Sequence, residues 1–323
     1  MQLFQGYFNH RRNRHQRSIK NTLIVLVAIV LLGLTSTQSV KAAIVSEDAQ
    51  AEGSTGRLRY FYDDAVSSRN ACENLVLLGV GTAMRTSEYD ELLSGMVQDQ
   101  PTVAVMVDQN PFWFVKTNSR RFATFSNAIV DQLSDIVPAC RSAPQRIVVG
   151  GHSAGGQAAW DAVAAELYSF EVAGFLGLDP FRLDPNDRSD VPALLWGFTK
   201  TTCQVTASNA AKAGYQATSN TNRVFYQIDN ASNDAGHCSF TDNGCVGPIC
   251  PAPEESSTFV RESVSDSTQR FLAAIANREW DKESFQLGGE NDNDNDKDDI
   301  KLNLFVNQDT VRRLVRRTRY LRA

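Results

Sequence analysis

The sequence has few of the residues that usually build a metal centre. Its 323 residues include four histidines and six cysteines, and no Cys-x-x-Cys motif is present. Structural zinc sites generally combine cysteines and histidines at such short spacings. We therefore expect no zinc site in this chain.

Acidic residues are absent from residues 1–42, which carry six basic residues. The basic stretch is followed by an apolar run at 23–34 and by small residues at 42–43. This order is typical of a secretory signal peptide, with cleavage after Ala42 or Ala43. An uncleaved membrane anchor is the alternative, although a run of this length is short for a membrane span. The basic residues are Arg11, Arg12, Arg14, Arg17, Lys20 and Lys41.

Loss of residues 1–42 would change the formal net charge from −5 to −11, because the segment holds six positive charges and no negative one. Such a chain is a poor electrostatic match to nucleic acid, so we expect no nucleic-acid partner. The cysteines fit an oxidising compartment on the secretory route and predict disulfide bonds. They are Cys72, Cys140, Cys203, Cys238, Cys245 and Cys250.

Apolar runs and helical patterns alternate along most of the chain. Strands are predicted at 57–62, 75–80, 102–107, 146–150, 172–178, 192–198 and 223–228, and helices at 87–97, 118–137, 157–168, 207–217 and 265–276. This alternation predicts one α/β domain over residues 43–286, with a doubly wound, mostly parallel sheet.

The two ends of this domain have a different composition. Residues 43–56 are polar, and we expect them to form a loose N-terminal segment. Residues 287–323 are predicted to be an acidic low-complexity linker followed by a basic tail. The tail is either solvated or makes a peripheral contact with an acidic surface or a membrane.

Residues 146–156, RIVVGGHSAGG, join a predicted buried strand to a predicted helix through a Gly-x-Ser-x-Gly motif. This context predicts a nucleophile elbow, in which Ser153 stands on a sharp turn above the sheet. Gly151 and Gly155 leave room for the strand and helix backbones to approach closely. The amide of Ala154, at the helix N-terminus, is a predicted donor to an oxyanion.

A serine nucleophile needs a base, and histidine is the usual one. His10 and His15 lie in the basic leader. His152 is adjacent to the serine, where we do not expect its ring to reach back to the hydroxyl. His237 follows the last predicted core strand and is therefore the predicted base.

The acid that orients the base should follow a strand between Ser153 and His237. Residues 192–222 contain no Asp or Glu, whereas Asp179 directly ends the preceding strand. We therefore predict Asp179, with Asp184 and Asp187 in the same loop as alternatives. The histidine's own loop contains Asp229 and Asp234, which we expect to shape that loop.

A second oxyanion donor is expected in the loop after strand 75–80, where the sequence is Val-Gly-Thr. The backbone amide is the donor, so the side chain is not decisive. We assign this role to the amide of Thr82, or to that of a neighbouring residue.

The order Ser153, Asp179, His237 on alternating strands and helices resembles the α/β-hydrolase fold over residues 57–276. Within it, GHSAGG at 151–156, GLDP at 177–180 and the cysteine Cys203 resemble the chlorophyllase family and its lipase-like relatives. The resemblance implies a serine hydrolase that releases phytol from chlorophyll, an apolar ester, without a metal or an organic cofactor. Two positions depart from the plant enzymes: Ala154 stands where they usually have arginine, and the sequence HCSF at 237–240 differs from their form around the histidine.

The resemblance leaves other functions open. The acid position also resembles that of platelet-activating-factor acetylhydrolases, so a lipase or esterase acting on other lipid esters is the main alternative. A hydrolase-fold binding protein without turnover is the second. The aromatic segment 111–115 is interpreted either as a lid over an apolar substrate or as packing against the long helix.

The same fold suggests how the cysteines pair. Cys72 and Cys140 precede strands that are neighbours in it, so we pair them. The other four cysteines gather near the predicted active end. We expect disulfides among them to rigidify the His237 loop.

Overall fold

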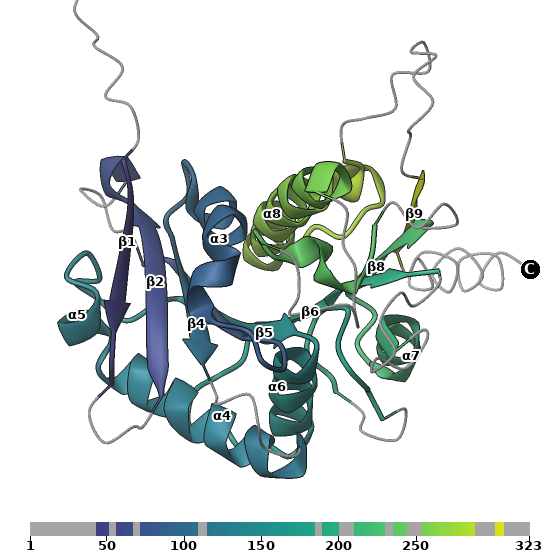
Figure 1. Cartoon of the computed structure of the whole chain (residues 1–323). Coiled ribbons are helices and arrows are strands. Elements are labelled where there is room, and N and C mark those ends of the chain that lie inside the picture. The colour runs from purple at the N-terminus through teal and green to yellow at the C-terminus, as the bar shows by residue number, and fades with distance from the viewer. Residues whose placement is uncertain are drawn as a thin grey trace, which may run out of the picture. The chain divides into compact units, whose positions relative to one another are not determined.

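The structure is a computed structural model of the full chain. It describes residues 43–51, 56–66, 72–108, 115–184, 189–199, 210–229, 235–243, 254–287 and 301–306. These residues form an α/β domain on a nine-stranded sheet of order β1-β2-β4-β3-β5-β6-β7-β8-β9 (Figure 1). None of the helices in these ranges is both long and apolar enough to cross a bilayer.

The strands β3 to β8 run parallel and form the centre of the sheet, as the alternating sequence predicts. β1, β2 and β9 add antiparallel neighbours at the two sides. Parallel strands covered on both faces have continuous apolar sequences, and every residue of β3, β6 and β7 is buried. The strands are β1 (Ile44–Ala49), β2 (Arg57–Asp63), β3 (Asn74–Gly79), β4 (Thr102–Asp108), β5 (Arg146–His152), β6 (Gly174–Leu178), β7 (Ala193–Phe198), β8 (Arg223–Asp229) and β9 (Lys301–Val306).

Helices cover both faces of the sheet (Figure 1). Alternate side chains of β3 point to opposite faces, so Val76 and Leu78 join a core with α3 and α8, whereas Leu75 and Leu77 join a core with α4 and α6. The predicted two-sided arrangement is confirmed. The helices are η1 (Thr86–Tyr89), α3 (Asp90–Val97), α4 (Val115–Asp131), α5 (Leu133–Ile136), α6 (Ala154–Ala164), α7 (Ala210–Ala217), η2 (His237–Phe240), α8 (Glu254–Asn277) and η3 (Glu283–Phe285).

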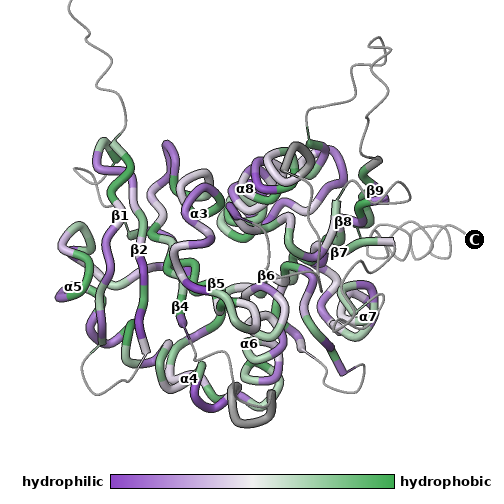
Figure 2. Tube along the Cα trace, viewed as in Figure 1, coloured by the Kyte–Doolittle hydropathy of each residue, from purple (hydrophilic) through white to green (hydrophobic). Residues whose placement is uncertain are grey.

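Both outermost strands lie where the sequence predicts no regular structure. β1 lies in the segment expected to be loose, yet it pairs with β2 over its whole length. β9 lies beyond the expected domain end at residue 286 and pairs antiparallel with β8. An edge strand has one neighbour and an exposed side, so it needs fewer apolar residues. β1 is accordingly mixed, because Ile44 and Val45 at its start are followed by three hydrophilic residues, and Figure 2 shows both colours along it.

Two helices also differ from their predicted bounds. The helix predicted over 118–137 is divided at Gln132, which has a φ of −109° and a ψ of 13°. α8 starts well before the predicted residue 265. The buried side chains described in its first half are two valines, Val260 and Val264, and otherwise polar residues such as Ser257, Arg261 and Ser263. An apolar stripe therefore does not reveal that half in the sequence.

A disulfide joins Cys72 to Cys140, with their Cα atoms 5.2 Å apart, and this is the predicted pair. It connects the segment before β3 to the segment before β5, which are adjacent strands. Cys238 is disulfide-bonded as well, to a partner outside the described residues. Cys203, Cys245 and Cys250 all lie outside those residues.

Candidate active site

Ser153 stands on a sharp turn between β5 and α6, as the motif predicts. Its φ of 52° and ψ of −120° lie in a region that residues with a side chain rarely adopt. Such backbone strain costs about 1–3 kcal/mol and is typical of functional sites. A Cβ on Gly155 would lie 2.2 Å from the carbonyl oxygen of Gly79, so only glycine lets α6 start this close to β3.

Asp179 and His237 come together at the carboxyl end of the sheet. Asp179 follows β6, and its amide donates to the carbonyl of Trp196 at 2.8 Å. His237 begins η2, which follows β8, and its Nδ1 lies 2.7 Å from Asp179 Oδ2. Of the alternative acids, Asp184 is exposed and Asp187 lies outside the described residues.

The contact with Asp179 fixes which nitrogen of the neutral His237 ring carries the proton. A carboxylate can only accept, so His237 donates its Nδ1 proton to Asp179 and keeps Nε2 as the basic nitrogen. The two side chains are 4% and 11% exposed, so little water competes for this hydrogen bond.

Ser153 lies next to this pair. Its amide donates at 3.1 Å to the carbonyl of Leu178, the residue before Asp179. Its own carbonyl accepts at 2.9 Å from the amide of Phe181. Ser153 is 4% exposed, so the turn, the acid and the histidine are all buried at the same end of the sheet.

His152 is a residue whose role the sequence does not reveal. It is 1% exposed, and its ring centroid is 4.4 Å from that of His237. Its Nδ1 lies 2.8 Å from the Tyr89 hydroxyl, and its Nε2 lies 2.8 Å from the backbone oxygen of His237. Burial lowers the pKa of His152 well below its usual 6.5, and the nearby His237 lowers it further. His152 is therefore neutral.

Two backbone amides near Ser153 could bind an oxyanion. Ala154 is the first residue of α6, and amides in the first turn have no acceptor within the helix. The second predicted amide is in the turn after β3, where Gly81 donates its own N–H to the Tyr89 hydroxyl at 3.0 Å. Gly81 is therefore engaged elsewhere, and Thr82, the predicted donor, is the next residue and is exposed.

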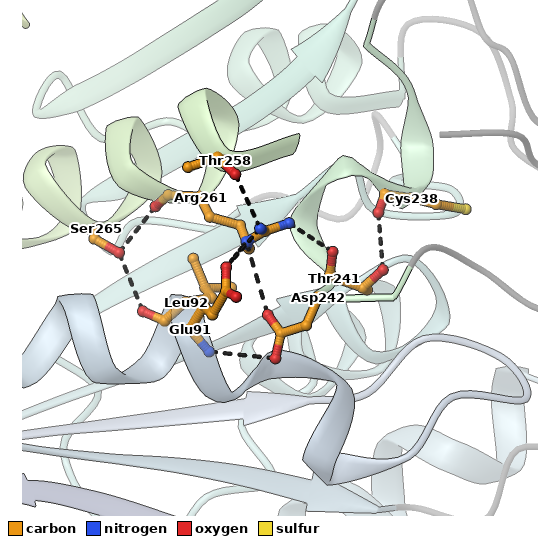
Figure 3. Close-up of polar contacts among 8 residues, drawn as sticks. All are labelled: Glu91, Leu92, Cys238, Thr241, Asp242, Thr258, Arg261 and Ser265. Carbon is orange, nitrogen blue, oxygen red and sulfur yellow. Dashed lines mark hydrogen bonds and ion pairs between the residues drawn. The ribbon is translucent and has the colours of Figure 1, made fainter. Parts of the chain in front are cut away.

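The segment that carries His237 is tied to α8 and α3 through Arg261 (Figure 3). Arg261 is 6% exposed, and its Nη1 donates to the Thr241 carbonyl at 2.8 Å. The same guanidinium forms an ion pair with Glu91 on α3 and lies 3.7 Å from Asp242. The Thr241 hydroxyl in turn donates to the carbonyl of Cys238 at 2.8 Å. These contacts connect the C-terminal end of η2 to α8 and α3.

Asp242 is the second acidic residue near Arg261, and it also contacts η1 and α3. Its Oδ2 accepts from the amide of Glu91 at 3.3 Å, and its amide donates to the carbonyl of Glu88 at 2.8 Å. Burial raises the pKa of Asp242 to about 6. Near neutral pH its charge is therefore sensitive to the cation of Arg261.

The remaining predicted residues divide between the described and the undescribed parts. Asp229 accepts from the Thr199 hydroxyl at 3.1 Å, which connects the end of β8 to the residue directly after β7. Asp234 and residues 111–114 of the aromatic segment lie outside the described residues. Among the residues that are described, no group of three or more His, Cys, Asp and Glu could hold a metal ion.

No protein-family model matches the sequence, and no curated protein matches it either. The roles of Ser153, Asp179 and His237 must therefore be inferred from their own contacts. The arrangement combines a strained serine turn, a buried Asp–His pair and backbone donors at one end of an α/β sheet. These are the parts that acyl transfer through a serine requires.

Proposed function

We propose that the chain is a serine hydrolase of carboxylic esters with the α/β-hydrolase fold. The observation that carries the proposal is the 2.7 Å contact between His237 Nδ1 and Asp179 Oδ2, beside the positive-φ turn of Ser153. The nucleophile follows β5, the acid follows β6 and the histidine follows β8. This chain order is the one expected for a Gly-x-Ser-x-Gly elbow in that fold.

In the first half of the reaction, the Ser153 oxygen attacks the ester carbonyl and His237 Nε2 takes the serine proton. Asp179 holds the imidazole in the required tautomer and stabilises the imidazolium that forms. The carbonyl oxygen becomes an oxyanion, which accepts from the amides of Ala154 and Thr82. His237 then gives the proton to the leaving alcohol, and the acyl group remains on Ser153.

Water completes the reaction. His237 takes a proton from the water, whose oxygen attacks the acyl carbonyl, and the same two amides stabilise the second oxyanion. Collapse of this intermediate breaks the bond to the serine oxygen. His237 returns the proton to Ser153, and the carboxylic acid leaves.

The substrate is proposed from the sequence resemblance. GHSAGG at 151–156 and GLDP at 177–180 resemble chlorophyllases, so we propose chlorophyll as the ester that is cleaved, with release of phytol. Other lipid esters are the second candidate, because the acid position also resembles acetylhydrolases. The Cys72–Cys140 disulfide supports the proposal that the protein follows the secretory route.

The test uses the purified protein with chlorophyll a and, separately, with a nitrophenyl ester. Ser153→Ala is compared with Ser169→Ala, a matched change at an exposed serine between α6 and β6. We expect chlorophyllide from the wild type and from Ser169→Ala but not from Ser153→Ala. Cleavage of the nitrophenyl ester alone would support the esterase activity and would exclude chlorophyll as the substrate. Inactivity of folded protein on both esters would favour the binding protein.

A further inference from the structure

His152 connects three segments, β5, η1 and η2, whose relative positions matter for the proposed reaction. It belongs to β5, directly before Ser153. Its Nδ1 contacts Tyr89 at the end of η1, and its Nε2 contacts the backbone of η2 at His237. Tyr89 is fully buried and also accepts from the amide of Gly81, which precedes the proposed oxyanion donor Thr82.

The chemistry of these groups allows one arrangement of protons. The carbonyl of His237 can only accept, so His152 Nε2 carries the proton and donates it. Neutral His152 then has an unprotonated Nδ1, which accepts from the Tyr89 hydroxyl. The Tyr89 oxygen accepts from Gly81 N–H at 3.0 Å. Every donor in this chain of hydrogen bonds has an acceptor.

The packing around this chain leaves little freedom. A Cβ on Gly81 would lie 2.8 Å from His152 Nδ1, so the turn after β3 rests directly on the imidazole. The ring also contacts Tyr89 edge-on, with centroids 5.9 Å apart, and Phe240 at 5.5 Å. A shift of η1 or η2 would therefore break a buried hydrogen bond.

We infer that His152 and Tyr89 are positioning residues, which set the distance between the oxyanion amides and the His237 base. The inference rests on the proposed function. Neither side chain transfers a proton or forms a bond in this account, although the His152 ring packs against the His237 ring with centroids 4.4 Å apart. His152 acts through the backbone and the ring of His237, and Tyr89 acts through His152 and through the backbone of Gly81.

The first test is Tyr89→Phe, which removes the hydroxyl and keeps the ring. The matched control is Tyr226→Phe, since Tyr226 is also fully buried and donates its hydroxyl to a backbone oxygen, that of Phe285. We expect Tyr89→Phe to lower kcat by about 10- to 100-fold, with KM within about twofold, because misplaced oxyanion donors lose stabilisation of the transition state. Tyr226→Phe should lose stability and keep kcat. Equal kcat values for the two variants would overturn the inference.

A substitution series at His152 covers the case in which Tyr89→Phe does not fold. Gln can place an amide N–H near the position of Nε2, Asn can place a polar atom near that of Nδ1 only, and Phe keeps the ring without either contact. We expect His152→Gln to retain more of the wild-type kcat than Asn or Phe, by about tenfold. A purely structural role would follow the stability of the variants and give no rescue by Gln.

Imidazole ¹⁵N NMR separates failure of this inference from failure of the proposed function. His152, assigned by loss of its signal in His152→Gln, should be the neutral Nε2–H tautomer from pH 6 to 8. A proton on Nδ1, or a titrating ring, would overturn the network whatever the activity. If the tautomer is as expected but turnover does not depend on Ser153, the proposed function fails and the positioning role fails with it.

Discussion

Arg261→Met tests how the segment that carries His237 is held. Methionine keeps most of the length of the side chain and removes its charge and its donors. The Arg261 side chain is 7% exposed. Its guanidinium donates to the Thr241 carbonyl, pairs with Glu91 and lies near Asp242 (Figure 3). We expect the free energy of unfolding to fall by about 3 kcal/mol at pH 8.

This magnitude follows from the three partners of Arg261. The Thr241 carbonyl loses its charged donor, which costs about 1–3 kcal/mol. The Glu91 side chain is 62% exposed, so its ion pair adds less than about 1 kcal/mol. Asp242 is 12% exposed and loses its nearby cation. A further rise of about one unit in the pKa of Asp242 costs about 1.4 kcal/mol at pH 8, so the three losses sum to about 3 kcal/mol.

The pH dependence has a definite sign. The pKa of Asp242 is already raised from 3.8 to about 6, and loss of the cation raises it further. A group whose pKa is raised on folding stabilises the fold when protonated and loses this contribution as pH rises through its folded pKa. The cost of Arg261→Met should therefore be about 1 kcal/mol smaller at pH 5 than at pH 8.

Urea unfolding at both pH values measures this cost. Arg270→Met is the matched control, because Arg270 lies on the same helix but pairs with Asp266 in a half-exposed position. We expect the control to cost less than about 1 kcal/mol at either pH. An equal cost for the two arginines, or a cost of Arg261→Met that does not change with pH, would refute this reasoning.

Three further predictions concern the frame of the site. Gly155→Ala places a Cβ 2.2 Å from the Gly79 oxygen, and we expect a loss of about 3 kcal/mol by urea unfolding together with loss of esterase activity. Replacing Cys72 and Cys140 by Ala opens a loop with a sequence separation of 68, and the same assay should show a loss of about 4 kcal/mol. The pKa of buried His152 is lowered on folding, so stability is lost as pH falls below about 6.5. Between pH 7.5 and 5.5 the wild type should lose about 1 kcal/mol more than His152→Gln.

The sequence predicts the centre of the fold better than its edges. Strands β3 to β8 are covered on both faces, so their apolar runs identify them directly. β9 alternates, with half-buried Leu302, Leu304 and Val306 separated by exposed residues, but this signal follows a long acidic run. β1 has the sequence IVSEDA and little apolar pattern, because its only neighbour is β2.

The site shows the same division. Ser153 is predicted from the Gly-x-Ser-x-Gly motif between a strand and a helix, and Asp179 because it directly ends a strand. His237 is predicted because the other histidines are unsuitable. The contacts of His152 are not predictable in this way. Tyr89 is 63 positions away in the sequence and His237 is 85 away, and no local pattern connects them. The contacts of Arg261 cannot be predicted for a similar reason, since its partners lie on α3 and directly after η2.

The central claim is that Ser153 is a nucleophile activated by His237. The most direct measurement is reaction of the purified protein with a fluorophosphonate, followed by mass spectrometry of its peptides. We predict one phosphonate per chain, on Ser153, and labelling slowed by about 10³-fold or more in His237→Gln. Folded protein that is not labelled at Ser153, or is labelled equally fast without His237, would contradict the account.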